Sequence, residues 1–323
     1  MRPLRVVPPV PAPELYAALQ AALDGGPPLG FQPGEVDDDV CLVVPTSGST
    51  GEPKLVELTA ACLRASVAAT ASVVGEGRWW LQLPVTHIAG LQVVIRSGFA
   101  PSAEADGCAF TSLVPTQLRR MLDDPRLPRL DAVLLGGAAA PPPLLAAARD
   151  RGIRVVTTYG MSETSGGCVY DGRPLPGVTV ELDDRIVLSG PVVARGYVGG
   201  DRFAGRFVTS DVGRLVDGRL EVLGRADQLI NSGGEKIAPA PVEAALAEHP
   251  AVEDVVVIGV PDDEWGQRVV ACVVLSGALT LDEARDWVAE RVSRIAAPRE
   301  LRVVPALPLL PSGKVDRLGL TTS

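Results

Sequence analysis

A run of hydroxyl-bearing residues and glycines that ends in a lysine is the strongest candidate for chemistry in the sequence. It reads Thr46-Ser47-Gly48-Ser49-Thr50-Gly51-Glu52-Pro53-Lys54. The glycines let several backbone N–H groups point at one spot, the hydroxyls add donors and the lysine adds a positive charge, a combination that suits a phosphate. The run is not a GxxxxGK[ST] loop, because its two glycines are too close and a proline precedes the lysine. Taken alone, it indicates either a phosphate-binding loop or an ordinary turn.

Four further motifs combine glycine or serine with charged residues. They are Tyr159-Gly160-Met161-Ser162-Glu163-Thr164, Thr209-Ser210-Asp211-Val212-Gly213, Gly224-Arg225-Ala226-Asp227-Gln228-Leu229-Ile230 and Pro311-Ser312-Gly313-Lys314-Val315-Asp316-Arg317. With the phosphate loop, and in this order, they make the chain resemble the adenylate-forming superfamily of acyl-CoA synthetases, luciferases and peptide-synthetase adenylation domains. The resemblance implies two steps that use ATP, Mg²⁺ and CoA. A carboxylate attacks the α-phosphate of ATP to give an acyl adenylate and pyrophosphate, and a thiol then displaces AMP.

The resemblance assigns most of the motif residues to the nucleotide. The loop would hold the β- and γ-phosphates, adenine would lie between bare backbone and the ring of Tyr159, and Asp211 would accept hydrogen bonds from the ribose hydroxyls. The implied ATP- and AMP-binding residues are Thr46, Ser47, Gly48, Ser49, Thr50, Gly51, Lys54, Gly136, Gly137, Ala138, Tyr159, Gly160, Met161, Ser162, Asp211 and Arg225.

Three residues are implied as catalytic. Glu163 would bind Mg²⁺, an ion that prefers oxygen ligands and needs only one or two protein carboxylates. Lys314 would bridge the carboxylate and the α-phosphate in the transition state, and His87 belongs to a motif beside the acyl pocket. Outside the family context, Glu163 would be read as a helix cap, Lys314 as a solvated lysine near the chain end and His87 as a packed or surface histidine.

The resemblance also implies a rotation of the C-terminal part between the two steps. Asp227 matches the hinge position. After rotation, a glycine-rich loop would line the channel for the pantetheine arm of CoA. The residues implied there are Ser232, Gly233, Gly234 and Lys236.

The acid is indicated by a histidine and an arginine nine residues apart. His87 and Arg96 flank an apolar stretch, where an arginine needs a partner or a cavity, and a second substrate carboxylate would be a suitable bidentate partner. With the small residues Ser165, Gly166 and Gly167, which leave room for an aromatic ring, this pattern resembles the 2-succinylbenzoate-CoA ligases of menaquinone biosynthesis. A surface ion pair at Arg96, a ligase for another aryl or acyl acid, a stand-alone adenylation domain and an inactive nucleotide-binding relative remain alternatives.

Apolar runs that alternate with helical patterns must position these residues. The pattern predicts an α/β fold with helix-covered sheets. Its predicted strands include Val40–Val44, Ala132–Leu135, Val155–Thr158, Val252–Val260 and Arg268–Leu275, and its predicted helices Glu14–Leu23, Thr59–Val74 and Leu281–Ile295. Near residue 224 the pattern of predicted elements changes to α+β after a polar loop. This change predicts a large nucleotide- and acid-binding domain over 1–224 and a mobile α+β lid with the catalytic lysine over 225–323. The phosphate loop comes early for this superfamily, which predicts a compact form with a shortened N-terminal region.

Composition restricts the partners. The chain has 323 residues and a net charge of −9, which argues against nucleic acid or an anionic membrane as a nonspecific partner. Pro, Gly or Arg interrupts every apolar stretch, the N-terminus shows no signal peptide, and five scattered cysteines with two histidines make no zinc set. The expected partners are a small carboxylic acid, ATP and CoA, in the cytoplasm, and a homodimer is left open.

Overall fold

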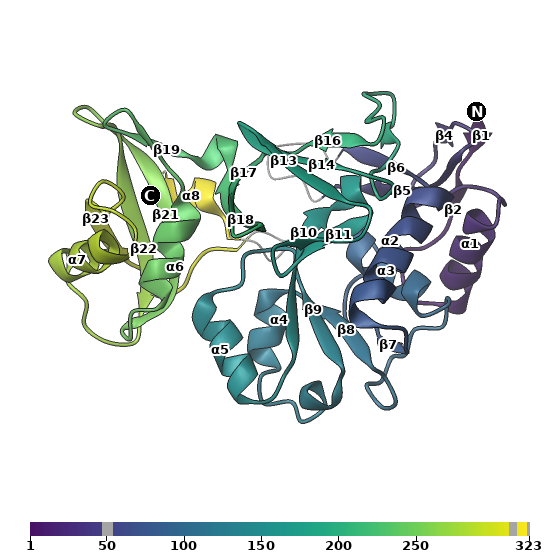
Figure 1. The fold of residues 1–323 in the computed structure, drawn as a ribbon, viewed down its shortest axis with the longest axis horizontal. Coiled ribbons are helices and arrows are strands. Elements are labelled where there is room, and N and C mark those ends of the chain that lie inside the picture. The colour runs from purple at the N-terminus through teal and green to yellow at the C-terminus, as the bar shows by residue number, and fades with distance from the viewer. Residues whose placement is uncertain (47–53, 310–314, 322–323) are drawn as a thin grey trace.

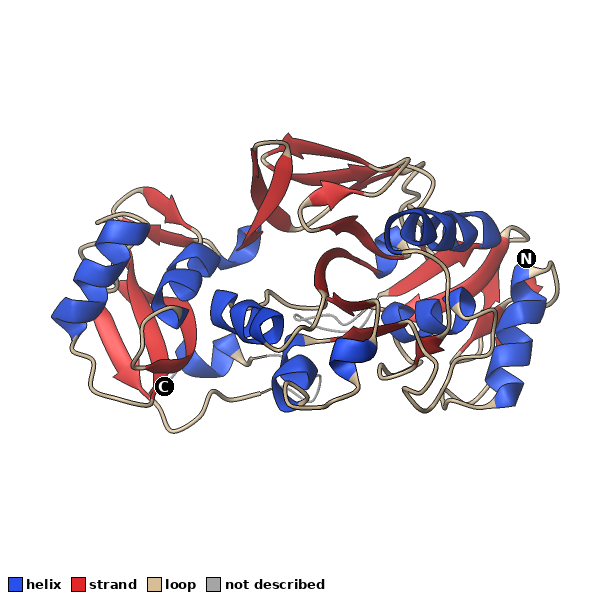
Figure 2. Ribbon diagram, turned by 60° about the horizontal axis from the view of Figure 1, so that its bottom comes forward, coloured by secondary structure: helices blue, strands red, loops and turns tan. Residues whose placement is uncertain are grey.

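The computed structural model describes residues 1–46, 54–309 and 315–321. Figure 1 shows the N-terminal elements at one end, the C-terminal elements at the other, and the hairpin of β17 and β18 between them. In Figure 2, helices cover the sheets of both ends from outside. The α/β class predicted from the sequence is confirmed.

The first sheet carries both ends of the phosphate loop. Its strand order is β15-β6-β5-β3-β2, and β1 pairs with β4 beside it. Buried leucines and valines of the strands pack against α1, α2 and α3, which gives one shared core. The bounds are β1 (Arg2–Pro3), β2 (Arg5–Val6), α1 (Pro13–Leu23), β3 (Leu29–Gly30), β4 (Glu35–Val36), β5 (Val40–Pro45), β6 (Leu55–Thr59), α2 (Ala60–Val74), α3 (Ile88–Arg96) and β15 (Gly196–Tyr197).

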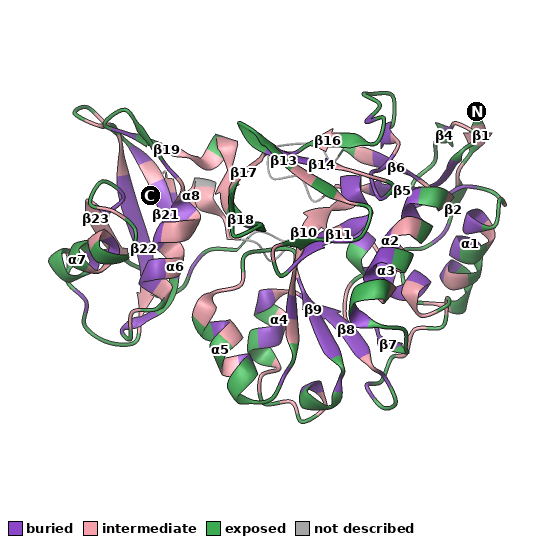
Figure 3. Cartoon of the chain, viewed as in Figure 1, coloured by how far each residue is buried: buried purple, intermediate pink, exposed green. Residues whose placement is uncertain are grey.

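The second sheet has six strands in the order β12-β11-β10-β9-β8-β7. Strands β7 to β10 are parallel, and β11 and β12 are antiparallel to their neighbours. Along β9, Val133 and Leu135 pack towards α4 and α5, whereas Ala132 and Leu134 pack towards α2 and α3. Because helices cover both faces, the central strands are apolar throughout, and Figure 3 shows β8 and β9 largely buried. The bounds are β7 (Trp79–Trp80), β8 (Phe110–Leu113), α4 (Pro115–Arg120), η1 (Leu127–Arg129), β9 (Ala132–Leu135), α5 (Pro142–Asp150), β10 (Val155–Met161), η2 (Ser162–Thr164), β11 (Gly166–Tyr170) and β12 (Arg173–Pro174).

A three-stranded sheet and a hairpin follow. The sheet has the order β13-β14-β16, and the hairpin pairs β17 with β18. The bounds are β13 (Thr179–Asp183), β14 (Arg185–Ser189), β16 (Arg206–Val208), β17 (Asp211–Val216), β18 (Arg219–Arg225) and η3 (Ala226–Gln228).

The C-terminal sheet has the order β20-β19-β22-β21, with β23 also paired to β22. Val242 of α6 and Val288 of α7 pack on one face, and Leu320 of α8 packs on the other. The bounds are β19 (Ile230–Ser232), β20 (Glu235–Ile237), α6 (Pro239–Ala247), β21 (Val252–Asp262), β22 (Gly266–Leu275), α7 (Leu281–Arg291), β23 (Glu300–Val303) and α8 (Arg317–Thr321).

The buried clusters of the C-terminal part contain only residues from Ile230 onwards. One hydrogen bond that crosses to the preceding part runs from Arg119 Nη1 to the carbonyl oxygen of Glu253, at 3.4 Å. This separation supports the predicted boundary between residues 224 and 225, which we retain as a proposal.

One predicted helix is too long. The helix expected over Leu281–Ile295 ends at Arg291, and Val292 leaves the helical conformation with φ of −120° and ψ of −78°. Val292 and Ile295 are exposed, so a longer helix would have gained no burial from them. No helix among the described residues is long and apolar enough to cross a membrane.

Candidate active site

The predicted nucleotide residues gather where parallel strands of the second sheet end. Gly136 follows β9, Tyr159 and Met161 lie at the end of β10, and Glu163 follows in η2. The carboxyl ends of adjacent parallel strands share one edge of a sheet, which is a usual place for a ligand. Residues more than twenty positions apart in the sequence are therefore neighbours.

Asp211 joins this group from the hairpin. The hydroxyl of Tyr159 donates a hydrogen bond to Asp211 Oδ2 at 2.7 Å, and the amide of Asp211 donates to Thr209 Oγ1 at 3.0 Å. Burial and the nearby carboxylate hold the pKa of Tyr159 well above its usual value, so the phenol stays protonated and remains a donor. The two residues expected to flank adenine and ribose are thus in direct contact.

Two glycines of the group are required by close packing. A Cβ on Gly136 would lie 2.3 Å from Thr158 Oγ1. A Cβ on Gly160 would lie 2.2 Å from the carbonyl oxygen of Gly166 and 2.7 Å from Cα of Gly167, where β10 and β11 meet. Gly137, with φ of +81°, and exposed Ala138 continue the turn after β9. These positions keep backbone accessible at the strand ends.

The turn after Glu163 is held by two helices. Ser165 adopts a left-handed conformation with φ of +56°. Its carbonyl oxygen accepts hydrogen bonds from Ser66 Oγ of α2 at 3.2 Å and from Gln92 Nε2 of α3 at 2.8 Å. Ser165 Oγ donates to the carbonyl oxygen of Val192 at 2.7 Å. Gln92 could not be selected from the sequence, because its partner is a distant backbone carbonyl.

Glu163 fits an Mg²⁺ ligand by its surroundings. The residue is 8% exposed, and Tyr197 donates a hydrogen bond to its Oε1 at 2.7 Å. No lysine or arginine among the described residues forms an ion pair with this carboxylate. A buried carboxylate without a cation is costly, and a hard divalent cation would supply the missing charge. Among the described residues, no three metal-ligating side chains cluster together.

The two ends of the phosphate loop are joined. The amide of Thr46 donates to the carbonyl oxygen of Lys54 at 2.8 Å, and the amide of Lys54 donates to Thr46 Oγ1 at 3.1 Å. Lys54 Nζ lies 4.8 Å from the centre of the Tyr197 ring. The predicted phosphate-binding residues between these ends, Ser47, Gly48, Ser49, Thr50 and Gly51, lie outside the described residues.

Arg225 and Asp227 bind one another. Arg225 Nε lies 2.9 Å from Asp227 Oδ1, and Nη2 lies 2.8 Å from Oδ2. The hydrogen bonds of this pair lower the pKa of Asp227 and raise that of Arg225. The predicted nucleotide contact and the predicted hinge are therefore linked in this conformation.

The glycine-rich loop of the C-terminal part lies under a tryptophan. Gly233 and Gly234 have φ of +61° and +84°, and a Cβ on Gly233 would lie 2.9 Å from Trp265 Cε3. Ser232 is buried with no hydrogen-bond partner for its Oγ, and Lys236 is exposed on β20. Lys314 lies outside the described residues. Leu309 and Val315, which flank it, form an antiparallel bridge beside the sheet.

The acid-binding candidates His87 and Arg96 lie at opposite ends of α3. His87 is the N-cap residue and Arg96 the last helical residue, so about 14 Å of helix separates them. Arg96 lies with its guanidinium carbon 5.4 Å from the centre of the Trp79 ring, and its Nε is buried without a hydrogen-bond partner. No aspartate or glutamate of the described residues pairs with it, which argues against the surface ion pair left open above.

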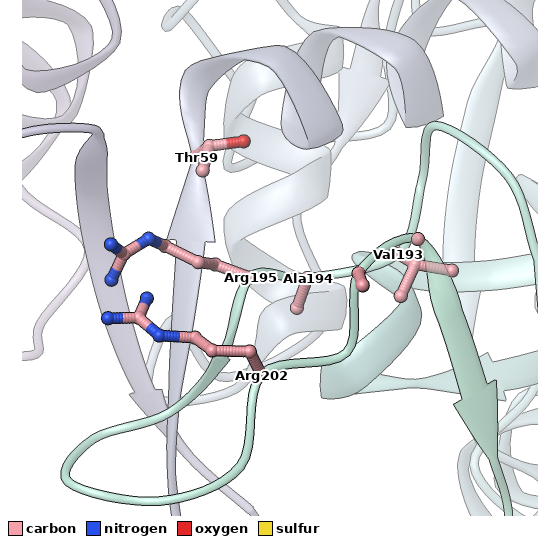
Figure 4. A pocket seen from close by; sticks show the side chains of 7 residues that line it. Thr59, Val193, Ala194, Arg195 and Arg202 are labelled. Carbon is pink, nitrogen blue, oxygen red and sulfur yellow. The ribbon is translucent and has the colours of Figure 1, made fainter.

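A hollow of about 450 Å³ is lined by residues on both sides of β15, among them Ala194, Arg195 and Arg202 (Figure 4). Arg195 and Arg202 run side by side along it, but their guanidinium groups bind Asp37, Asp39 and Glu57. With three carboxylates for two arginines, the hollow does not suit an anion.

Comparisons with known proteins identify the family of this chain. The model of the AMP-binding enzyme family matches residues 10–198, and that of the AMP-binding enzyme C-terminal domain matches 241–314. A probable 2-succinylbenzoate–CoA ligase of Mycobacterium tuberculosis is 46% identical over 88% of this chain and 85% of its own length. The 2-succinylbenzoate–CoA ligase of Escherichia coli is 34% identical over 87% of this chain and 68% of its own.

Solved structures give the same result. The o-succinylbenzoate CoA synthetase of Bacillus subtilis, in complex with its acyl-adenylate intermediate, superposes with a TM-score of 0.76 at 29% identity and covers 88% of this chain and 69% of that one. The resemblance drawn from the motifs is confirmed, and the chain belongs to the AMP-binding, adenylate-forming enzyme family.

Proposed function

We propose that this protein is an AMP-forming carboxylate–CoA ligase that converts 2-succinylbenzoate to 2-succinylbenzoyl-CoA in menaquinone biosynthesis. One observation carries the proposal. The Tyr159 hydroxyl bonds Asp211 at the carboxyl end of β10, and Glu163 follows in η2, in a chain 46% identical to a probable 2-succinylbenzoate–CoA ligase. The geometry supports nucleotide chemistry, and the relatives indicate the acid.

In the first step, the substrate carboxylate attacks the α-phosphorus of ATP, the bond to the β-phosphate oxygen breaks, and pyrophosphate leaves. The Tyr159 ring and the backbone after β9 bind adenine, and Asp211 accepts hydrogen bonds from the ribose. Lys54 and the loop before it offset charge on the leaving group, and Lys314 does so at the reacting oxygens. Mg²⁺ held by Glu163 would neutralise further phosphate charge.

In the second step, the CoA thiol loses its proton and attacks the acyl carbonyl, and AMP leaves. We propose that the C-terminal part rotates about Asp227 between the steps. Rotation carries Lys314 away and brings Ser232, Gly233, Gly234 and Lys236 to the CoA channel. Arg225 must exchange its bonds to Asp227 for the nucleotide at one of these stages. We place the reaction in the cytoplasm, where ATP and CoA are available.

For the acid, we propose that Arg96 binds the carboxylate that is not activated. The Arg96 guanidinium has donors without a hydrogen-bond partner, and no carboxylate of the described residues forms an ion pair with it. A substrate carboxylate would accept hydrogen bonds from these donors. His87 lies at the other end of α3. An extended dicarboxylate would reach from the site of adenylation to Arg96. The turn of Ser165, Gly166 and Gly167 would border its ring.

The test is a pyrophosphate-release assay with purified protein, ATP, Mg²⁺ and a panel of acids. The panel contains 2-succinylbenzoate, benzoate, a fatty acid and several amino acids, and CoA is added or omitted. We expect 2-succinylbenzoate to give the highest kcat/KM, and CoA to be required for AMP release. Preference for another acid would reassign the substrate, transfer only to a carrier protein would identify an adenylation domain, and no turnover with any acid would indicate an inactive relative.

Arg96 variants test the acid assignment separately. Arg96→Ala removes charge-assisted hydrogen bonds that are worth about 1.5 to 3 kcal/mol, so the KM for 2-succinylbenzoate should rise roughly 10- to 150-fold. The KM for ATP should change less than about threefold. Arg96→Lys keeps the charge but loses the bidentate geometry. Its KM for 2-succinylbenzoate should lie between that of the unmodified protein and that of Arg96→Ala. Equal increases in both KM values would make Arg96 a structural residue.

A further inference from the structure

Tyr197 occupies a position between two charged residues of the proposed ATP site. Its hydroxyl donates to Glu163 Oε1 at 2.7 Å, and the Lys54 ammonium lies 4.8 Å from the centre of its ring. The edge of the ring packs against Phe203, with ring centroids 5.0 Å apart. One aromatic side chain thus contacts both the carboxylate expected to bind Mg²⁺ and the lysine at the end of the phosphate loop.

The backbone of β15 fixes Tyr197 relative to both neighbours. Tyr197 pairs with Val56 of β6, and the amide of Val198 donates to the carbonyl oxygen of Leu55 at 2.9 Å, directly after Lys54. Three residues before Tyr197, the amide of Ala194 donates to the carbonyl oxygen of Glu163 at 2.8 Å. The strand is therefore tied to the end of the phosphate loop and to the turn that carries Glu163.

An ion-pair cluster anchors the residue that precedes the strand. Arg195 Nη1 lies 3.0 Å from Glu57 Oε2, and its Nε lies 2.8 Å from Asp39. Arg202 also binds Glu57, whose side chain is 6% exposed. Figure 4 shows the two arginines extended side by side. Arg195 directly precedes β15, so these contacts hold the backbone next to Tyr197, whose hydroxyl bonds Glu163.

We propose that Tyr197 is a positioning residue that fixes the Glu163 carboxylate for Mg²⁺ through its hydroxyl and holds the Lys54 ammonium through its ring. The hydroxyl bonds Oε1 and so restricts rotation of the carboxylate, which would keep Oε2 available to a divalent cation. The proposal rests on the ATP- and Mg²⁺-binding function given above.

The test measures ATP affinity by calorimetry in excess Mg²⁺ and again in EDTA, and takes the ratio of the two affinities. Tyr197→Phe removes the hydroxyl and keeps the ring. We expect this ratio to fall about 10- to 100-fold, as for other groups that orient metal ligands, with the affinity in EDTA nearly unchanged. A purely structural effect would lower both affinities alike and leave the ratio constant. An unchanged ratio would overturn the proposal.

Tyr197→Leu separates the ring from the hydroxyl. It should lower the ratio as Tyr197→Phe does, and it should also weaken ATP binding in EDTA by about two- to fivefold, because Lys54 loses its cation–π contact. Equal ATP affinities of Tyr197→Phe and Tyr197→Leu in EDTA would show that the ring does not contribute to ATP binding.

The matched control is Tyr170→Phe. Tyr170 is a buried tyrosine whose hydroxyl, like that of Tyr197, has a side-chain partner: it lies 3.0 Å from Thr70 Oγ1 of α2. Loss of the Tyr170 hydroxyl should leave the ratio of ATP affinities in Mg²⁺ and in EDTA unchanged. In a Glu163→Gln background, Tyr197→Phe should have no further effect on the ratio, and an undiminished effect there would show that Tyr197 does not act through Glu163. If the unmodified protein shows no Mg²⁺-dependent ATP binding at all, the result contradicts the proposed function itself and not only the role of Tyr197.

Discussion

The contact between Tyr159 and Asp211 allows a quantitative test of the nucleotide site. Tyr159→Phe keeps the ring for stacking and removes one hydrogen bond of 2.7 Å to a carboxylate. Such bonds contribute about 1.5 to 3 kcal/mol, and because both residues are only partly buried, water can replace part of the loss. We expect a cost of about 1.5 to 2 kcal/mol in the free energy of unfolding. For a domain of this size, that cost lowers Tm by about 3 to 8 °C.

Two assays separate stability from binding. Thermal unfolding without ligand gives the stability of Tyr159→Phe, Asp211→Asn and the double variant, and equilibrium binding gives their ATP affinities. In the double-mutant cycle, a coupling energy of about 1 kcal/mol or more is expected between the two residues. ATP affinity should fall only a few-fold in Tyr159→Phe and much further in Asp211→Asn, since the aspartate itself would bind ribose. A coupling near zero would refute the reasoning.

Three further outcomes follow from the same structure. Lys314→Ala should abolish adenylate formation but spare thioester formation from supplied acyl adenylate, and equal loss of both half-reactions in rapid-quench assays would contradict its assigned role. Asp227→Pro should stall CoA transfer while pyrophosphate release from the first turnover persists, whereas unchanged CoA turnover would remove the hinge. Urea unfolding should show stability falling as pH rises above about 9: burial raises the pKa of Cys41 and that of Cys168 each to about 12, so both thiols ionise first in the unfolded chain. Cys41→Ala should flatten this decline, and an identical slope would refute it.

Much of the fold could be predicted because its strands are apolar and short and its helices are periodic. Val40–Val44 and Ala132–Leu135 correspond to β5 and β9, and Thr59–Val74 to α2 with its N-cap. The end of α7 was wrong because apolar Val292 and Ile295 continue its pattern without being buried. Very short strands such as β15 were not predicted, since two residues carry no periodicity.

The candidate site could be predicted only where family motifs mark it. Tyr159, Glu163 and Asp211 were identified this way, and the structure brings the first and third into contact. Tyr197 and Gln92 were missed, because their hydrogen-bond partners lie 34 and 73 residues away in the sequence. No local sequence pattern indicates such distant contacts. The link between Arg225 and Asp227 was also missed, although the residues are two positions apart, because each had been assigned a separate role.

All five cysteines are buried, and this makes the protein a convenient subject for site-specific labelling. Thiol-reactive dyes should leave the native side chains alone, so a cysteine pair introduced at exposed positions could be labelled without first removing them. The neighbourhood of Arg119 and Glu253, where the two parts of the chain touch, is a natural place for such a pair. Energy transfer between the dyes during turnover would then show whether the C-terminal part rotates as we propose.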